Sequence, residues 1–223
     1  MEFHPTREDW EKELERREQW KQATDPMLEL ALREALVLYE FDPENPKQPV
    51  MVEDFPIAAE SICGLMPRLL DRLRGSQTLR GGLFQADFLA TLSGELLVTL
   101  VYHRRLGEGW ELAARDLAAA LAIQVIGRSR GQKVALDRDW LLEEFELNGR
   151  RLRYQQIEGS FTQPNGGVNR QMLGWSGQQA AGLGGDLLEL YCGNGNFTMA
   201  LAPLFDKVLA TEVSKSSVRA AQY

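Results

Sequence analysis

Hydrophobic and polar residues follow two different patterns along the chain, and the change falls near Ser160. Before it, apolar residues recur in short, partly alternating runs, and "LFQADFLATLSGELLVTLVYH" predicts two strands joined at Ser93-Gly94. Asn148-Gly149 separates two further alternating runs, which is a strong short-range signal for a β-hairpin. The pattern therefore predicts an α+β domain over residues 55–158 with a mostly antiparallel sheet.

Two helices and two more strands are predicted in the same domain. Residues 58–74 are amphipathic, and Pro67 is expected to bend or interrupt this helix because proline cannot donate the backbone hydrogen bond. Residues 111–121 form a second helical pattern, while "IQVIGRS" and "QKVAL" are typical of strands. The sequence shows no internal repeat and no low-complexity segment.

Beyond Ser160 the chain alternates between strand and helix patterns. "DLLELYC" and "KVLATEV" are mostly apolar runs typical of strands; a helix is expected to begin near Asn165, and Ser214 is a good N-cap for the last one. This order is typical of a parallel, doubly wound sheet, so residues 159–223 are predicted to begin a Rossmann-like α/β domain. Such sheets usually have about five to seven strands, so we expect the chain to be the front part of a longer protein.

The first 54 residues form a separate, acidic region. "REDWEKELERREQW" predicts an exposed, charge-laced helix over residues 7–21. Residues 27–36 continue a helical pattern, "ALVLYEF" is strand-like, and "DPENPKQP" is a turn-rich break.

Composition restricts the class of protein. With 223 residues, 44% hydrophobic and 26% charged, the chain is typical of globular domains. It has no apolar run near the roughly 20 residues that a membrane span needs, and its charged N-terminus is not a secretory signal. Cys63 and Cys192 are far apart and form neither a disulfide framework nor a metal cage, which suits a reducing compartment and predicts no metal.

The charge is uneven along the chain. The net charge of −7 argues weakly against a nucleic-acid partner, but half of the acids precede Ser61. Basic clusters follow, and each is either a solvated face or part of a phosphate-facing surface. They are Arg68/Arg72/Arg74/Arg80, His103/Arg104/Arg105, Arg128/Arg130/Lys133 and Arg150/Arg151/Arg153.

A glycine-rich turn after the first predicted parallel strand is the strongest chemical signal. In "DLLELYCGNGNF", Gly193 and Gly195 would let a ligand approach bare backbone, and Glu212 closes the next strand, where an acid binds ribose hydroxyls. NAD, FAD and S-adenosylmethionine all fit this spacing, as does a plain tight turn without a ligand. Thr198 stands where a dinucleotide site needs a small residue, which favours S-adenosylmethionine.

These segments resemble one family. "SFTQPNGGVNRQML" with "GDLLELYCGNGNFTMALAPLFDKVLATEVSKSSVRAAQY" is similar to the bacterial tRNA (uracil-5)-methyltransferases, which modify the T-loop uridine. Upstream, "VEDFPIAAESI" and "VIGRSRGQKVALDRDWLLE" resemble the RNA-binding domain of that family. Residues 1 to about 36 match it poorly.

The resemblance implies a cofactor, a partner and site residues. The cofactor would be S-adenosyl-L-methionine and the partner the T-arm of tRNA, with tmRNA as a further RNA, in the cytoplasm and with neither membrane nor metal. Phe84 and His103 match positions near the RNA, where exposed rings stack on splayed bases. The implied cofactor contacts are Gln163, Tyr191 and Asn196 with Glu212, around Gly193 and Gly195.

The implied chemistry is covalent. A cysteine thiolate adds to C6 of uracil, C5 takes the methyl group, a carboxylate removes the C5 proton, and the cysteine leaves. The target base must first leave its stack. The family places the nucleophile and the base further downstream, so we expect this chain alone to be inactive. A helix N-terminus could lower the pKa of Cys192, but its place in the cofactor loop does not suit attack on C6.

Two other functions remain open from the sequence. The chain could be a non-catalytic RNA-binding module that uses its first sheet, or a fragment of a nicotinamide-dependent oxidoreductase. Binding of a T-arm hairpin without any cofactor would favour the first, and preference for NAD would favour the second.

Overall fold

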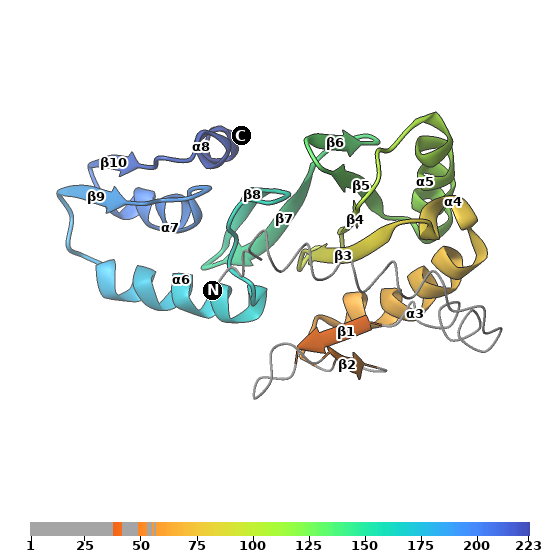
Figure 1. Ribbon diagram of the computed structural model, residues 1–223. Helices are drawn as coiled ribbons and strands as arrows, with labels where there is room; N and C mark the ends of the chain where they lie inside the picture. Colours follow the sequence, from red (N-terminus) through yellow and green to blue (C-terminus); the bar gives the residue numbers. More distant parts are fainter. Residues whose placement is uncertain (1–37, 42–48, 53–54, 56) are drawn as a thin grey trace. The chain divides into compact units, whose positions relative to one another are not determined.

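The computed structural model describes residues 38–41, 49–52, 55 and 57–223 (Figure 1). The helices predicted over residues 7–21 and 27–36 lie outside these ranges. The chain divides into two compact units, residues 1–53 and 54–223, and each is considered by itself. In the first unit, β1 (Leu38–Phe41) pairs antiparallel with β2 (Pro49–Val52).

The second unit begins with helix α3 (Glu60–Gly75), which buries Leu65 and Leu69 on one face. The helix is continuous through Pro67, so the proline does not interrupt it. A short helix α4 (Gln77–Arg80) follows, and Ser76 caps it by accepting a hydrogen bond from the N–H of Leu79.

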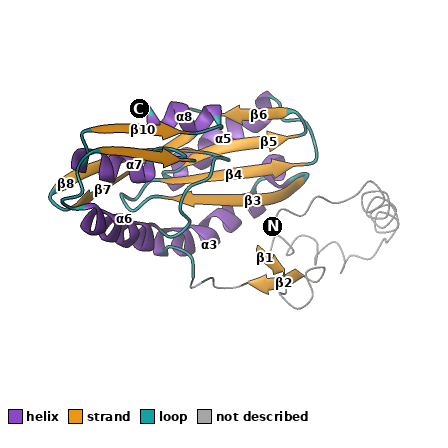
Figure 2. Cartoon of the chain, turned by 90° about the vertical axis from the view of Figure 1, so that its left-hand side faces the viewer, coloured by secondary structure: helices purple, strands orange, loops and turns teal. Residues whose placement is uncertain are grey.

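A four-stranded sheet forms the centre of this unit. Its order is β3 (Leu83–Ala90), β4 (Leu96–Tyr102), β5 (Gln124–Ser129), β6 (Gln132–Ala135), as Figure 2 shows. The outer pairs are antiparallel as predicted, whereas β4 and β5 are parallel because helix α5 (Glu108–Leu121) connects them. Trp110 of α5 packs on β5 at Gly127, where a side chain would collide with it.

A β-hairpin of β7 (Trp140–Leu147) and β8 (Arg150–Ile157) follows. Its turn has positive φ at both central residues, 51° at Asn148 and 76° at Gly149, as the sequence pattern predicted. The carboxylate of Glu143 accepts hydrogen bonds of 3.0 Å from the N–H of Leu92, so the hairpin is tied to the β3–β4 turn.

The last segment has the predicted order of helices and strands. It consists of α6 (Gly166–Ala180), β9 (Asp186–Leu190), α7 (Asn196–Leu201), the 3₁₀ turn η1 (Ala202–Leu204), β10 (Lys207–Thr211) and α8 (Lys215–Ala221). Asn165 and Ser214 cap α6 and α8 with their side chains. Strands β9 and β10 are parallel, with Leu188 opposite Leu209.

One apolar cluster joins the hairpin to this last segment. Tyr154 and Leu152 of β8 pack with Leu173 of α6, and Phe197 of α7 packs against the same group. By contrast, Leu188 is 59% exposed, so one apolar side of the parallel pair is uncovered, although such strands are usually buried on both faces. No helix in the described ranges is long and apolar enough to cross a membrane.

Candidate functional site

The loop between β9 and α7 carries three residues in the left-handed region of backbone conformation. Gly193 (φ 59°) and Gly195 (φ 81°) adopt it freely, whereas Tyr191 (φ 58°) adopts it at a cost. Tyr191 is also 81% exposed. A strained backbone with an exposed aromatic side chain is often a sign of a binding site.

Glu212 reaches this loop from the end of the neighbouring strand. Its carboxylate accepts a hydrogen bond of 2.9 Å from the N–H of Gly193 and two of 2.7 Å from the N–H groups of Val213 and Ser214. The bonds from Ser214 and Gly193 hold the pKa of Glu212 below its ordinary value. The carboxylate is therefore ionised at neutral pH, and it keeps unused acceptor capacity for a ligand's hydroxyl groups.

Asn196 begins helix α7, and its side chain faces the interior of the domain. Its side-chain amide exchanges two hydrogen bonds with the side-chain amide of Asn169 on α6. Its backbone carbonyl oxygen accepts a third from the hydroxyl of Tyr154. The structure thus brings Tyr191, Gly193, Gly195, Asn196 and Glu212 together around one loop. Whether each contacts a cofactor stays a prediction.

Gln163 belongs to the segment that leads into α6, two residues before the N-cap Asn165, and is half-buried. Thr198, which argued against a dinucleotide, donates its hydroxyl hydrogen to the carboxylate of Glu189 on β9. Burial raises the pKa of this Glu189 carboxyl, and the bond from Thr198 opposes the shift. Thr198 therefore ties the first turn of α7 to the strand that precedes it.

The two cysteines are half-buried and lie in different surroundings. Burial, with the nearby charges of Glu189 and Glu212, raises the pKa of the Cys192 thiol, so the suggested lowering by a helix N-terminus is wrong. The thiol of Cys63 donates a hydrogen bond of 3.1 Å to the carbonyl oxygen of Phe55. Among the described residues, no group of three or more acidic, histidine or cysteine side chains is placed to hold a metal ion.

Phe84 and His103, predicted to lie near RNA, are in contact. Their ring centroids are 4.4 Å apart at an interplanar angle of 60°, and Phe84 is 54% exposed, so it is not a core aromatic. Arg104 turns inward and donates to the carbonyl oxygen of Gly81, whereas Arg105 is exposed. The structure thus offers two exposed rings in contact, and an exposed arginine follows two residues after His103.

Two of the other basic clusters are partly neutralised by acids. Arg128 and Lys133 both pair with Glu158, at 2.7 Å and 3.0 Å. Arg153 lies 3.2 Å from the carboxylate of Glu144. These pairs offset part of the positive charge, but the side chains of Arg128 and Arg153 stay 40% and 55% exposed, so a phosphate-facing role for these clusters stays a prediction.

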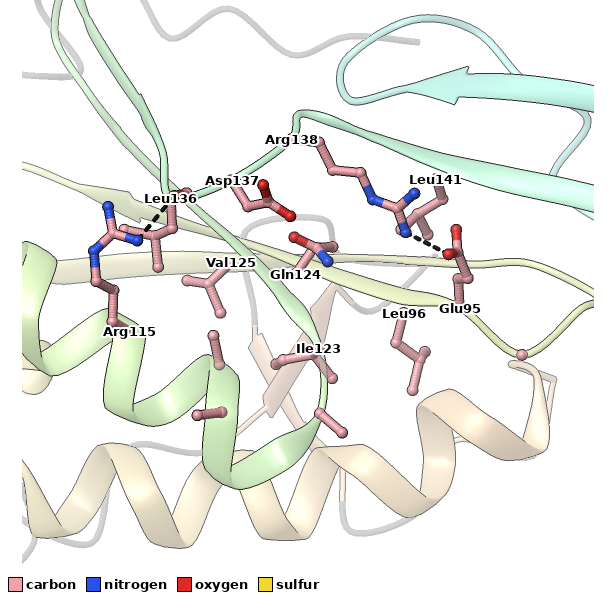
Figure 3. Close-up of a pocket in the computed structure, with 14 residues that line it drawn as sticks. Glu95, Leu96, Arg115, Ile123, Gln124, Val125, Leu136, Asp137, Arg138 and Leu141 are labelled. Carbon is pink, nitrogen blue, oxygen red and sulfur yellow. Dashed lines mark hydrogen bonds and ion pairs between the residues drawn. The ribbon is translucent and has the colours of Figure 1, made fainter.

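A cavity of about 550 Å³ lies between α5 and the β6–β7 connection (Figure 3). Arg115 and the Arg138–Glu95 ion pair stand at its two ends, and Ile123 and Val125 form part of its apolar wall. None of the predicted site residues lines it.

The sequence interpretation missed Asn169 and Tyr154. Asn169 is 7% exposed and Tyr154 is 3% exposed, and both donate a hydrogen bond to Asn196, the first residue of α7. A signal existed for Asn169, because it lies four residues before the buried Leu173 and so falls on the apolar side of α6.

The fold of this chain is also found in a solved structure. A solved structure with the same fold is that of the Pyrococcus abyssi tRNA (uracil-54, C5)-methyltransferase in complex with S-adenosyl-L-homocysteine. The TM-score is 0.58 at 14% sequence identity, over 79% of this chain and 46% of the other. The predicted fold class, a mixed α/β protein that ends in the start of a Rossmann-like domain, is therefore confirmed.

Sequence comparison narrows the class to a family. The family model described as tRNA (Uracil-5-)-methyltransferase matches residues 31–223, and the chain belongs to this family. The match begins at residue 31, near the end of the segment of about 36 residues that was expected to match the family poorly. The predicted domain boundaries stay predictions.

Curated relatives agree with this assignment. The tRNA/tmRNA (uracil-C(5))-methyltransferase of Dechloromonas aromatica (strain RCB) is 76% identical over 183 residues, which is 82% of this chain and 51% of that protein. The protein of the same name from Aromatoleum aromaticum (strain DSM 19018 / LMG 30748 / EbN1) is 71% identical over 82% of this chain and 50% of its own length. The chain thus spans about half the length of the curated relatives it matches.

Proposed function

We propose that this chain supplies the RNA-binding domain and the first part of the cofactor site of a tRNA/tmRNA uracil-C5 methyltransferase of the cytoplasm. Its target would be C5 of the T-loop uridine, and its methyl donor S-adenosyl-L-methionine. Family membership supports the reaction. The structural observation that carries the cofactor site is the hydrogen bond from Gly193 to Glu212, which brings the glycine loop and the carboxylate to one edge of the parallel pair.

The residues present fit an adenosyl group. Glu212 would accept hydrogen bonds from ribose hydroxyls, because its carboxylate has more acceptor sites than the three backbone N–H groups use. Space for a ligand exists at Gly193, where a side chain would meet nothing within 4 Å, and Tyr191 has a free aromatic face beside it. When bound, the cofactor supplies an electrophilic methyl group on its sulfonium.

The RNA would be held by the face that contains Phe84 and His103. Exposed rings stack on unpaired bases with little regard to sequence, and the exposed Arg105 would meet the phosphate backbone. The uridine must leave its stack before C5 can be reached, which suits a surface that holds splayed bases.

The covalent step would need a thiolate that adds to C6 and makes C5 nucleophilic. We infer that neither cysteine of this chain provides the thiolate. The pKa of the Cys192 thiol is raised, and the Cys63 thiol donates a hydrogen bond to a backbone carbonyl oxygen. The chain on its own should therefore bind ligands without turning over.

Isothermal titration calorimetry of the 223-residue chain tests the proposal. S-adenosylhomocysteine should bind, and NAD should bind at least tenfold more weakly. Preference for NAD would favour an oxidoreductase. Binding of a T-arm hairpin, without binding of either S-adenosylhomocysteine or NAD, would favour a non-catalytic RNA-binding module. Incubation with radiolabelled cofactor and unmodified tRNA should incorporate no label, and clear incorporation would refute the inferred lack of turnover.

A further inference from the structure

A hydrogen-bonded pair of asparagine side chains, of which Asn169 is buried and Asn196 half-buried, lies beside the glycine loop of residues 191–195. Asn169 donates to the side-chain oxygen of Asn196 over 3.0 Å, and Asn196 donates back to the oxygen of Asn169 over 2.7 Å. Asn169 is only 7% exposed, so its amide would be left unsatisfied in the interior without this partner. The two bonds therefore fix the orientation of both amide groups, and breaking them would destabilise the folded protein.

Strand β8 also holds the N-terminal end of α7. The hydroxyl of Tyr154 on β8 donates to the carbonyl oxygen of Asn196 over 3.0 Å, and the side chain of Asn194 donates to the carbonyl oxygen of Gln155 over 3.3 Å. The glycine loop is thus connected to α6 on one side and to the hairpin on the other.

These anchors matter because the loop has little order of its own. Helix α7 is six residues long, and isolated helices shorter than about 12 residues are marginal in water. The loop before it contains two glycines, which lose more conformational freedom on ordering than other residues. A ligand that had to order this segment would lose affinity, whereas a segment already held by its surroundings binds without that cost.

We propose that Asn169 is a positioning residue for the cofactor site, which acts by locking Asn196 and hence the loop from Tyr191 to Asn196. The assignment rests on the proposed function for its link to the cofactor. Asn169 touches no ligand in this proposal. A purely apolar residue would fill the same space, but it would not orient the amide of Asn196.

Three variants separate positioning from general stability. In Asn169→Leu the side chain keeps a similar volume but makes no hydrogen bond. In Asn169→Asp the ionised carboxylate cannot donate to Asn196, whereas a protonated carboxyl group can donate one bond and accept one, which restores the pair. Burial favours the protonated form, so this variant should recover on mild acidification. Asn148→Asp, in the hairpin turn, is the matched control for the charge change.

The first readout needs no cofactor. Hydrogen exchange of the amides of residues 193–199 should be about tenfold faster in Asn169→Leu than in the unaltered chain, while exchange in β4 stays unchanged, because one hydrogen-bond pair is worth about a factor of ten. Equal exchange in the loop, or acceleration throughout the domain, would overturn the positioning role whatever the cofactor proves to be.

The second readout is affinity for S-adenosylhomocysteine by calorimetry, normalised to the unaltered chain at each pH. Asn169→Leu should bind about tenfold more weakly at both pH 8 and pH 5. Asn169→Asp should be about tenfold weaker at pH 8 but within about threefold at pH 5, and Asn148→Asp should bind normally. Other ionisable groups on the surrounding elements, Tyr154 on β8 and Glu189 on β9, are common to all these proteins, so normalisation removes their titration.

The two proposals fail in different ways. Undiminished affinity of both Asn169 variants would overturn the positioning role alone. No binding by the unaltered chain, together with the expected change in exchange, would refute the cofactor assignment and leave Asn169 as the anchor of the loop.

Discussion

The carboxylate of Glu212 accepts a 2.9 Å hydrogen bond from the backbone N–H of Gly193, which joins the ends of two neighbouring parallel strands. The two residues are 19 positions apart in the chain, and each lies just beyond its own strand. This relationship places a fixed negative charge beside an open backbone, and the first prediction depends on it.

Replacement of Glu212 by Gln should weaken binding of S-adenosylhomocysteine by about tenfold or more, because a neutral amide accepts weaker hydrogen bonds than a carboxylate. The melting temperature should fall modestly, because the same weaker acceptor would also hold the three backbone N–H groups of Gly193, Val213 and Ser214. Calorimetry and thermal denaturation measure the two effects. Glu108→Gln, at an exposed position on α5, is the control and should bind like the unaltered chain.

Phe84→Ala should reduce affinity for a T-arm hairpin by about tenfold, because stacking of one base on an aromatic ring is worth about 1–3 kcal/mol. Stability should be nearly unchanged, since Phe84 is 54% exposed. Leu112→Ala on α5 removes a side chain that is 67% exposed and tests whether loss of any exposed apolar group has the same effect. Equal losses in a filter-binding assay would argue against a specific RNA face.

The ion pair of Glu158 should make stability depend on pH. Burial pushes the pKa of this carboxyl upward, but hydrogen bonds from Arg128 and Lys133 outweigh it, so the pKa is lower in the folded protein than in the unfolded chain. The stabilisation is therefore complete above the unfolded pKa of about 4.5 and is lost as the pH falls through the folded value.

Glu158→Gln removes this pH-dependent stabilisation. The variant should be less stable than the unaltered chain by about 1–2 kcal/mol at pH 7, and the difference should shrink toward pH 3. Denaturant unfolding at several pH values measures it. Glu146→Gln, at an exposed position on β7, should follow the unaltered chain throughout, and a constant deficit in Glu158→Gln would show that packing rather than charge is responsible.

Gly127→Ala should destabilise the central sheet. A Cβ atom there would lie 2.4 Å from the Trp110 ring and 2.5 Å from the Leu106 side chain, so α5 must move away from β5, at about 1–3 kcal/mol. Gly109→Ala in α5 meets nothing within 4 Å and should instead stabilise by up to about 1 kcal/mol. Unfolding free energies of the two variants with opposite signs would support this account, and a stable Gly127→Ala would contradict it.

The sequence by itself determined the local structure and the family. Alternating runs, Asn148-Gly149 and the cap at Ser214 act within a few residues of where they stand, so they predicted strands, hairpin and helix correctly. The order of strand and helix after Ser160 predicted the parallel pair β9–β10.

Only the tertiary structure decided which polar side chains face each other. From the sequence, Arg128 and Lys133 belonged to a solvated face or to a phosphate-facing surface, and only the fold showed that both pair with Glu158, about 25 to 30 residues away. Helix periodicity could place Asn169 on the apolar side of α6, but only the fold brought Asn196 of α7 to its amide. The physical reason is that a hydrogen bond or ion pair depends on distances of about 3 Å between distant segments, and periodicity along a chain carries no information about them.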